Sequence, residues 1–197
     1  MSKGLIGVVV FAVIVLFGGM WACSKRNTFI SLREDGKAQW QQVESQYQRR
    51  MDLIPNIVAS VKGEANFEQS TLEAVIAARA SATQVKINVD NLDEASIAKY
   101  KAAQGDLSNA LGRLMMVSEN YPNLKSNAAF GDLRVTLEGC ENRISTERMK
   151  YNDMAKDFNK AIQLFPGSIV AGSMQALPYF EAEAGAEKAP KVDFEKH

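Results

Sequence analysis

The chain has 197 residues, its 23 lysines and arginines are balanced by 23 aspartates and glutamates, and its single histidine is the last residue, His197. A net charge of zero argues against a general nucleic-acid-binding protein, which needs a basic face. With no second histidine, neither a histidine-based metal site nor a Ser–His or Cys–His catalytic pair can be assembled. We therefore expect no enzyme and no cofactor. Five prolines and few alternating β-branched runs favour an all-α chain.

The amino-terminal region has the composition of a membrane segment. Residues 4–24 carry no charge, and a helix of that length crosses a hydrocarbon core of about 30 Å. We predict that residues 1–24 are a single-pass signal anchor, because no good A-x-A cleavage site follows. The alternatives are a cleaved signal peptide and, since Ala22 precedes Cys23, a lipoprotein signal with lipidation of Cys23. The predicted location is the plasma membrane, with the lipid bilayer as a partner.

The side of the membrane depends on which alternative holds. Four basic residues follow the apolar run within residues 25–37, whereas Lys3 alone precedes it. The positive-inside rule then favours a cytoplasmic position for the rest of the chain. Lipidation of Cys23 would place it on the outer side instead.

After a polar juxtamembrane segment at residues 25–37, a first bundle helix is predicted from about Ala38 to about Asn66. Its apolar residues recur at helical spacing, and Arg50 occupies a position on that apolar stripe. Pro55 interrupts the pattern, because proline lacks the amide that a helix interior needs. Two interpretations remain open. Either a new helix capped by Asp52 begins near Leu53 and has Pro55 in its first turn, or one long helix bends there.

Two capping boxes predict the starts of the next helices, Ser70 with Glu73 and Asn91 with Glu94. Pro122 must stop the third helix near Tyr121, and Ser126 or Asn127 can cap the fourth. The fourth helix carries a heptad seam typical of bundle packing. Its members are Phe130, Leu133, Leu137, Cys140, Ile144, Glu147, Tyr151, Met154, Phe158, Ala161 and Phe165.

The predicted architecture is thus a long bundle of three to four helices over residues 38–166, and its antiparallel up-and-down order is what the family resemblance described next implies. An extended carboxy-terminal tail follows at residues 167–197.

Three motifs, in this order, resemble the LemA family of bacterial membrane proteins: RRMDLIPNIVASVKG at residues 49–63, ENYPNLKSNAAF at 119–130 and ENRISTERMKYN at 141–152. Glu64 departs from the family, which more often has an aromatic residue there. The resemblance implies an antiparallel helical bundle on a membrane tether. It does not imply an enzymatic activity, because none is agreed for the family. Members are often encoded near HtpX-like membrane metallopeptidases, which suggests a partner of that type and a role in membrane protein quality control. Looser matches are Trp40, Phe67-Glu68, Arg79, Phe165-Pro166 and Phe180-Glu181.

Polar residues in these motifs are the structural or interaction candidates. Arg50 and Glu147 both occupy apolar register, and a buried unpaired charge costs several kcal/mol. We therefore predict that Arg50 pairs across the bundle with Glu147 or Glu141, and an ion pair is a better interpretation of those carboxylates than acid–base catalysis. The full set of candidates is Arg49, Arg50, Asp52, Pro55, Asn56, Glu141, Glu147, Arg148, Tyr151 and Asn152.

The function expected from the sequence is non-catalytic. The protein should act by binding other proteins or copies of itself, as a homo-oligomer at the membrane. The alternative is a lipid-interacting or membrane-shaping coat, in which bundles pack side by side on the bilayer.

Overall fold

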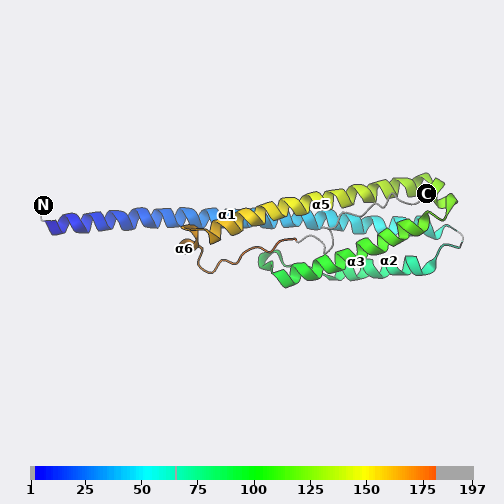
Figure 1. The fold of residues 1–197 in the computed structure, drawn as a ribbon, viewed down its shortest axis with the longest axis horizontal. Coiled ribbons are helices and arrows are strands. Elements are labelled where there is room, and N and C mark those ends of the chain that lie inside the picture. The colour runs from blue at the N-terminus through cyan, green and yellow to red at the C-terminus, as the bar shows by residue number, and fades with distance from the viewer. Residues whose placement is uncertain (1–2, 65, 181–197) are drawn as a thin grey trace, which may run out of the picture.

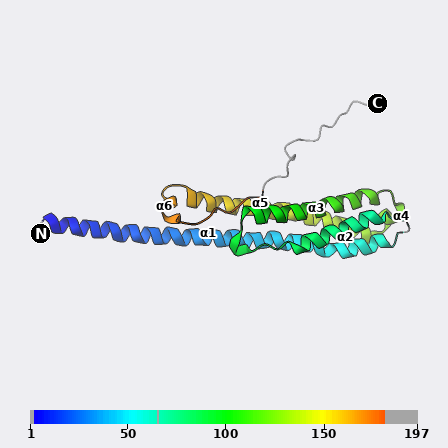
Figure 2. The ribbon, with the colours of Figure 1, turned by 90° about the horizontal axis from the view of Figure 1, so that it is seen from below.

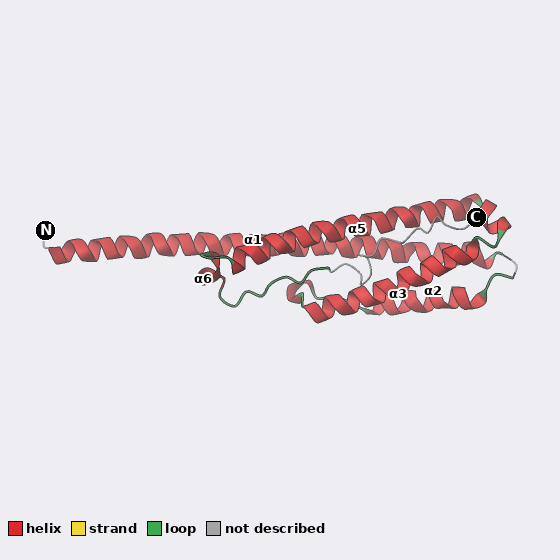
Figure 3. Ribbon diagram, in the orientation of Figure 1, coloured by secondary structure: helices red, strands yellow, loops and turns green. Residues whose placement is uncertain are grey.

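The computed structural model describes residues 3–64 and 66–180. In these ranges the chain forms helices and loops without a strand, so the predicted all-α class is confirmed (Figure 3). The elements are α1 (Lys3–Lys62), α2 (Gln69–Gln84), the short 3-10 helix η1 (Val89–Asn91), α3 (Glu94–Ser118), α4 (Pro122–Ser126), α5 (Ala128–Gln163) and α6 (Gly167–Ala171).

The long helix α1 contains both the apolar amino-terminal run and the first helix of the bundle. It runs without interruption for 60 residues, which is about 90 Å at 1.5 Å per residue. Its amino-terminal part projects beyond the bundle (Figures 1 and 2). The most apolar window of α1 is long and apolar enough to cross a membrane, and none of it is buried. The predicted start of a separate helix near Ala38 is wrong, since α1 continues through residues 25–37.

Helix α1 also continues through Pro55, so the interpretation with a new helix capped by Asp52 is wrong. Asp52 instead accepts a hydrogen bond from Gln48 Nε2, one turn back. Because Pro55 has no amide hydrogen, the carbonyl of Met51 loses its usual helical donor. The Nε of Arg79 on α2 donates to that carbonyl at 3.1 Å. A side chain from the neighbouring helix thus replaces the bond that the proline removes.

Replacing Arg79 by alanine should therefore destabilise the bundle by about 1–2 kcal/mol, because the Met51 carbonyl would be left without a donor. The same substitution in a Pro55→Ala background should cost less, since the restored amide of residue 55 can donate to Met51. Urea unfolding of the four proteins checks this double-mutant cycle. An Arg79→Ala cost that is equal in both backgrounds would show that the arginine does not compensate for the proline.

The four long helices form an up-and-down bundle. Helix α5 runs antiparallel to α1 along most of its length, and the α2–α3 hairpin packs beside them (Figures 1 and 2). Two apolar clusters fill the bundle. The cluster nearer the projecting part of α1 is rich in aromatic residues, including Phe29, Trp40 and Phe158. The distal cluster is mainly aliphatic and includes Leu107 and Leu137.

Helix starts agree with the sequence prediction in one case of three. Asn127 caps α5, because its Oδ1 accepts from the amides of residues 129 and 130. The predicted cap of α3 is wrong: Asp93, not Asn91, caps it by accepting from the Ser96 amide at 2.7 Å. The capping box at Ser70 is wrong as well, since Glu68 precedes α2 and forms no side-chain cap bond.

The predicted seam of α5 holds through Tyr151 and then shifts. Met154 is 39% exposed, whereas Ala155 is buried in its place, and Ile162 is buried where the seam predicts Ala161. Phe165 follows the end of α5 and is 81% exposed. The buried positions 151 and 155 are four apart where a strict heptad requires a step of three. Such an insertion, called a stutter, returns the pattern to the 3.6-residue period of a straight helix. The seam members that are buried as predicted are Phe130, Leu137, Cys140, Ile144, Tyr151 and Phe158.

The tail differs in part from the extended segment expected at residues 167–197. Its first residues form the short helix α6, which packs against α1 and α5. After Gly172 the chain turns back and runs along the bundle without regular structure as far as Phe180. We call residues 173–180 the strap. Residues 181–197 lie outside the described part of the chain.

Candidate interaction site

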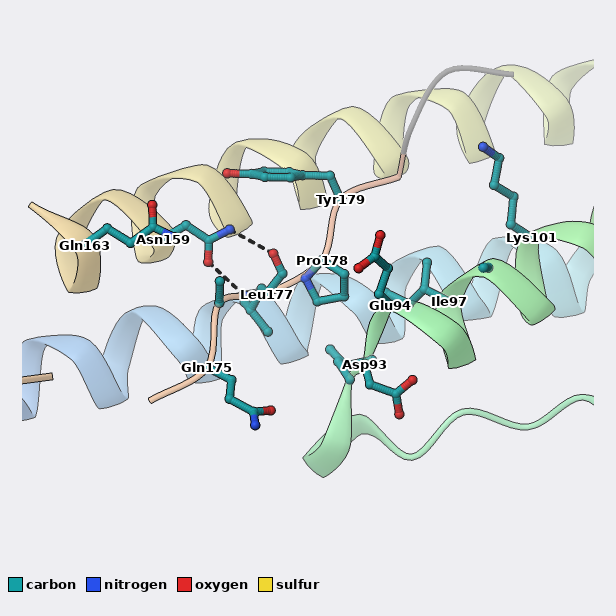
Figure 4. Close-up of a pocket in the computed structure, with 13 residues that line it drawn as sticks. Asp93, Glu94, Ile97, Lys101, Asn159, Gln163, Gln175, Leu177, Pro178 and Tyr179 are labelled. Carbon is teal, nitrogen blue, oxygen red and sulfur yellow. Dashed lines mark hydrogen bonds between the residues drawn. The ribbon is translucent and has the colours of Figure 1, made fainter. Parts of the chain in front are cut away.

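Two asparagines of α5 hold the main chain of the strap. Asn159 Nδ2 donates to the Leu177 carbonyl at 2.8 Å, and the Leu177 amide donates to Asn159 Oδ1 at 2.7 Å (Figure 4). Asn152 makes the same pair of bonds with Phe180, both at 2.8 Å. Each asparagine therefore satisfies one donor and one acceptor of an extended backbone. We call the surface that receives the strap the strap groove.

The spacing of these contacts follows from helix and strand geometry. Asn152 and Asn159 are seven residues apart, which is two helical turns and about 10.5 Å. Leu177 and Phe180 are three residues apart, and three extended residues span about 10 Å. The two lengths match, so both asparagines can bind an extended segment that runs antiparallel to α5.

Two side chains of the strap, Leu177 and Phe180, pack against complementary surfaces of α1 and α5. The Phe180 ring stacks on Trp40 of α1, with centroids 5.2 Å apart and planes 8° apart. The Arg148 guanidinium lies over the same Phe180 ring, at 5.0 Å from its centroid. Leu177 packs where α1 has Gly36, and a Cβ at that position would lie 2.7 Å from Leu177 Cδ1. A side chain at position 36 would therefore force the Leu177 side chain to shift.

The Tyr151 hydroxyl completes the contact by donating to the Pro178 carbonyl at 3.0 Å. Burial raises the pKa of Tyr151 well above its ordinary value, because the charged phenolate is poorly solvated there. The Tyr151 phenol thus stays protonated and keeps the hydrogen that it donates to Pro178. Tyr151 also packs edge-on against both Trp40 and Phe180, so one side chain links α5, α1 and the strap.

One side of the strap borders an open pocket of about 530 Å³ (Figure 4). Pro178 and Tyr179 form one wall, and the start of α3 forms the opposite wall with Asp93, Glu94 and Lys101. Tyr179 is 44% exposed. The groove therefore encloses the main chain of the strap and leaves room beside it for larger side chains.

A second polar cluster surrounds Arg50, whose side chain is 1% exposed. Its Nη1 donates to Glu141 Oε1 at 2.8 Å and to Ser108 Oγ at 2.5 Å. Its Nη2 donates to the Gln104 carbonyl at 3.0 Å and to Gln104 Oε1 at 2.6 Å. The guanidinium also lies 5.1 Å from the ring centroid of Tyr47. We call Arg50, Gln104, Ser108 and Glu141 the arginine layer.

The arginine layer lies between the two apolar clusters. On α1, Tyr47 belongs to the aromatic cluster and Met51 to the aliphatic one, with Arg50 between them. On α5, Ile144 and Leu137 belong to the two clusters on either side of Glu141. Because the layer joins α1, α3 and α5 by directional bonds, a slip of one helix would leave its polar groups unpaired.

The structure brings Arg50 together with Glu141, one of the two partners expected, and not with Glu147. Glu147 Oε1 accepts from Lys150 and its Oε2 from Gln39. The Lys150 ammonium, followed by the Gln39 amide, holds the pKa of Glu147 below its usual range. Glu147 is thus satisfied at the surface of the α1–α5 contact.

The other sequence candidates separate into two groups. Arg148, Tyr151 and Asn152 contact the strap, as described above. The remaining candidates lie on the exposed face of α1: Arg49, Asp52, Pro55 and Asn56.

The two cysteines differ in environment. Cys140 is buried in the bundle, and Cys23 is exposed on α1. Lipidation of Cys23 stays a prediction. Among the described residues, no group of histidine, cysteine and carboxylate side chains could hold a metal ion.

Sequence reasoning missed four residues of these sites: Asn159, Gly36, Gln104 and Ser108. One signal was present for the strap, since asparagines at positions 152 and 159 match the three-residue spacing from Leu177 to Phe180. Gln104 and Ser108 gave no such signal, because polar residues in α3 are equally compatible with a solvated face.

A model of the LemA family matches residues 39–194, which include the arginine layer and the strap. The magnetosome proteins MamQ 1 and MamQ 2 of Paramagnetospirillum magneticum (strain ATCC 700264 / AMB-1) are each 31% identical to the chain over 179 residues. The magnetosome protein MamQ of Magnetospirillum gryphiswaldense is 29% identical over 180 residues. Each match covers 81% of this chain and 66% of the relative. With the family model matching most of its length, the chain belongs to the LemA family.

Proposed function

We propose that the protein is a non-catalytic, single-pass membrane protein that works by binding extended polypeptide segments in the strap groove. The observation that carries this proposal is the pair of two-bond contacts from Asn152 and Asn159 to main-chain groups. Recognition through the main chain is how proteins bind extended segments, and the side-chain pockets add specificity. In the strap groove, those pockets are the surfaces beside Gly36 and Trp40.

The occupant that we propose is the strap of a second copy. An identical segment fits the groove with the same contacts, so exchange between copies changes little in contact energy. Anchoring both copies in one membrane raises their effective concentration toward each other. Exchange of straps would then link neighbouring bundles into a homo-oligomer. A role in membrane protein quality control beside an HtpX-type peptidase remains a prediction of the family resemblance.

The test is photo-crosslinking from Tyr179, replaced by p-benzoylphenylalanine in the full chain in native membranes. Two differently tagged copies are expressed together, and only one carries the photo-reactive residue. Strap exchange should give a covalent dimer that contains both tags. The dimer should be lost when the unlabelled copy carries Asn152→Ala with Asn159→Ala.

The matched control places the same residue at Met116 on α3, which is 71% exposed and takes no part in the strap groove. Crosslinks from position 179 that stay within one chain would contradict the exchange. Crosslinks only to a different protein would contradict self-assembly through the strap and identify a partner instead.

The second candidate function is a membrane-shaping coat. It is favoured by a separate observation, the exposed apolar side chains where α5 meets α6. A coat should form a large homo-oligomer without other proteins, and its binding to liposomes should survive removal of the anchor. A protein that is held at the membrane by its anchor alone should no longer bind liposomes in the same assay.

A further inference from the structure

Three large apolar side chains remain uncovered at the end of the bundle nearest the anchor. Phe165 is 81% exposed, Ile169 is 69% exposed and Leu164 is 63% exposed. Leu164 and Phe165 follow the end of α5, Ile169 lies in α6, and we call the three side chains the apolar tip. Uncovered apolar side chains gathered at one end of a molecule indicate a surface that another phase or molecule covers.

The apolar tip lies beside the part of α1 where the uncharged run ends. Helix α6 packs closely on α1: a Cβ on Gly167 would lie 3.1 Å from Phe29 Cζ and would collide with the Ala161 carbonyl oxygen. Trp21 and Lys25 of α1 line one groove together with two members of the tip, Leu164 and Phe165. Figure 1 shows α6 against α1 at the end of the bundle from which the amino-terminal part projects.

The height of the tip can be compared with the dimensions of a bilayer. Phe29 lies five residues beyond Ser24, the last residue of the uncharged run, which is about 7.5 Å along a helix. The headgroup layer on each side of the hydrocarbon core is about 5–7 Å thick. With the hydrocarbon boundary near Ser24, the contact between α6 and Phe29 lies at the outer edge of that layer, and the side chains of the tip are within reach of it.

The surroundings of the tip have the composition of an interfacial site. Trp21 is typical of the boundary between hydrocarbon and headgroups. Lys25, Arg26 and Lys160 are exposed close by, where they can approach lipid phosphates. Asp157 is the one acidic residue among those that line the groove, beside the basic Lys25 and Lys160.

We propose that the apolar tip inserts into the headgroup region of the bilayer that holds α1, so that the protein contacts its membrane at two places. Burial of the three side chains in the interface is favourable for the same reason as burial in a core. A single helix leaves a bundle free to rotate about the anchor, and the second contact fixes which face is turned toward the membrane. This inference rests on the proposed anchor and is independent of strap exchange.

The experiment measures the depth of a nitroxide spin label by its accessibility to oxygen and to a water-soluble nickel chelate. The full chain, with Cys23→Ser, is reconstituted in phosphatidylethanolamine and phosphatidylglycerol vesicles and labelled at Ile169→Cys. Buried Cys140 is left in place, and the parent without an added cysteine gives its background. The label at position 169 should show a severalfold lower accessibility to the nickel chelate than a label in water, with a higher accessibility to oxygen.

Two further labels make the result decisive. Val135→Cys on α5 is the aqueous control, because Val135 is 69% exposed, as Ile169 is, and lies toward the distal end of the bundle. Val10→Cys reports whether α1 is inserted, so failure of the anchor is distinguished from failure of the tip. With position 10 deep in the bilayer, equal accessibilities at positions 169 and 135 would overturn the proposal. The strap crosslink is unaffected by either outcome.

Discussion

Phe158→Ala should lower the free energy of unfolding by about 3–5 kcal/mol, the usual cost of removing a fully buried phenylalanine. Phe158 is 0% exposed and belongs to the aromatic cluster with Phe29 and Trp40. Its removal would leave a cavity between α1 and α5 that rigid helices cannot close. Urea unfolding of the chain without residues 1–24 is the measurement, since the most apolar window of α1 makes no buried contact.

Phe165→Ala is the matched control, because the heptad pattern places both phenylalanines on the same seam. Phe165 is 81% exposed, and exposed substitutions usually change stability by less than about 0.5 kcal/mol. A similar loss from the two variants would show that Phe165 is buried as the heptad pattern predicts, against the observed structure.

The seam of α5 shows which features of the fold can be predicted from the sequence and which cannot. Helix type follows from apolar spacing, and the end of α3 follows from the breaker Pro122. The continuity of α1 through residues 25–37 and the short helices α4 and α6 do not follow from either signal. The stutter does not follow, because Met154 and Ala155 are both acceptable core residues. Which of them faces α1 depends on whether α5 supercoils or stays straight, and packing over the whole length of the helices decides that.

Pro55 illustrates a second limit. Proline predicts a break or a bend, since the missing amide leaves a carbonyl without a donor. Whether another donor reaches that carbonyl depends on the neighbouring helix. Here the donor is Arg79, which lies 28 residues after Met51 in the chain. The local sequence predicts that the Met51 carbonyl loses its helical donor at Pro55. Only the tertiary structure shows that Arg79 replaces that donor.

The strap groove shows the same limit for the candidate site. Asn152 and Tyr151 belong to a recognisable motif, so the sequence identified these two α5 residues that bind the strap. Asn159 lies outside that motif, and a single asparagine in a helix is usually a solvated residue. Its importance appears only when Leu177 folds back from the tail, a contact between residues 18 positions apart that no helical period predicts.

Glu141→Leu should destabilise the protein by about 3 kcal/mol, because it leaves the buried guanidinium of Arg50 without an anion. The cost should lie at the low end of the range for buried pairs, since the Glu141 side chain is 40% exposed and water can reach its position. Arg50→Met should cost somewhat less, about 2 kcal/mol, because the remaining carboxylate can be hydrated while only the acceptors on Gln104 and Ser108 lose their donor.

The double variant Arg50→Met with Glu141→Leu tests whether the two residues act as a pair. Replacing both charges by apolar groups of similar size removes the uncompensated charge, so the combined loss should be smaller than the sum of the single losses by about 1–2 kcal/mol. Glu147→Leu combined with Arg50→Met is the matched control, and these effects should add within about 0.5 kcal/mol, because Glu147 bonds to Lys150 and Gln39 instead.

Strong coupling of Arg50 with Glu147, or none with Glu141, would contradict the observed pairing. The stability cycle also separates two roles of the arginine layer. If the double variant loses less stability than the sum of the single variants yet shows several folded conformations by NMR, the layer sets the register of α1, α3 and α5. That outcome is expected, because apolar side chains at these positions would merge the two clusters into one continuous core in which neighbouring registers differ little in energy.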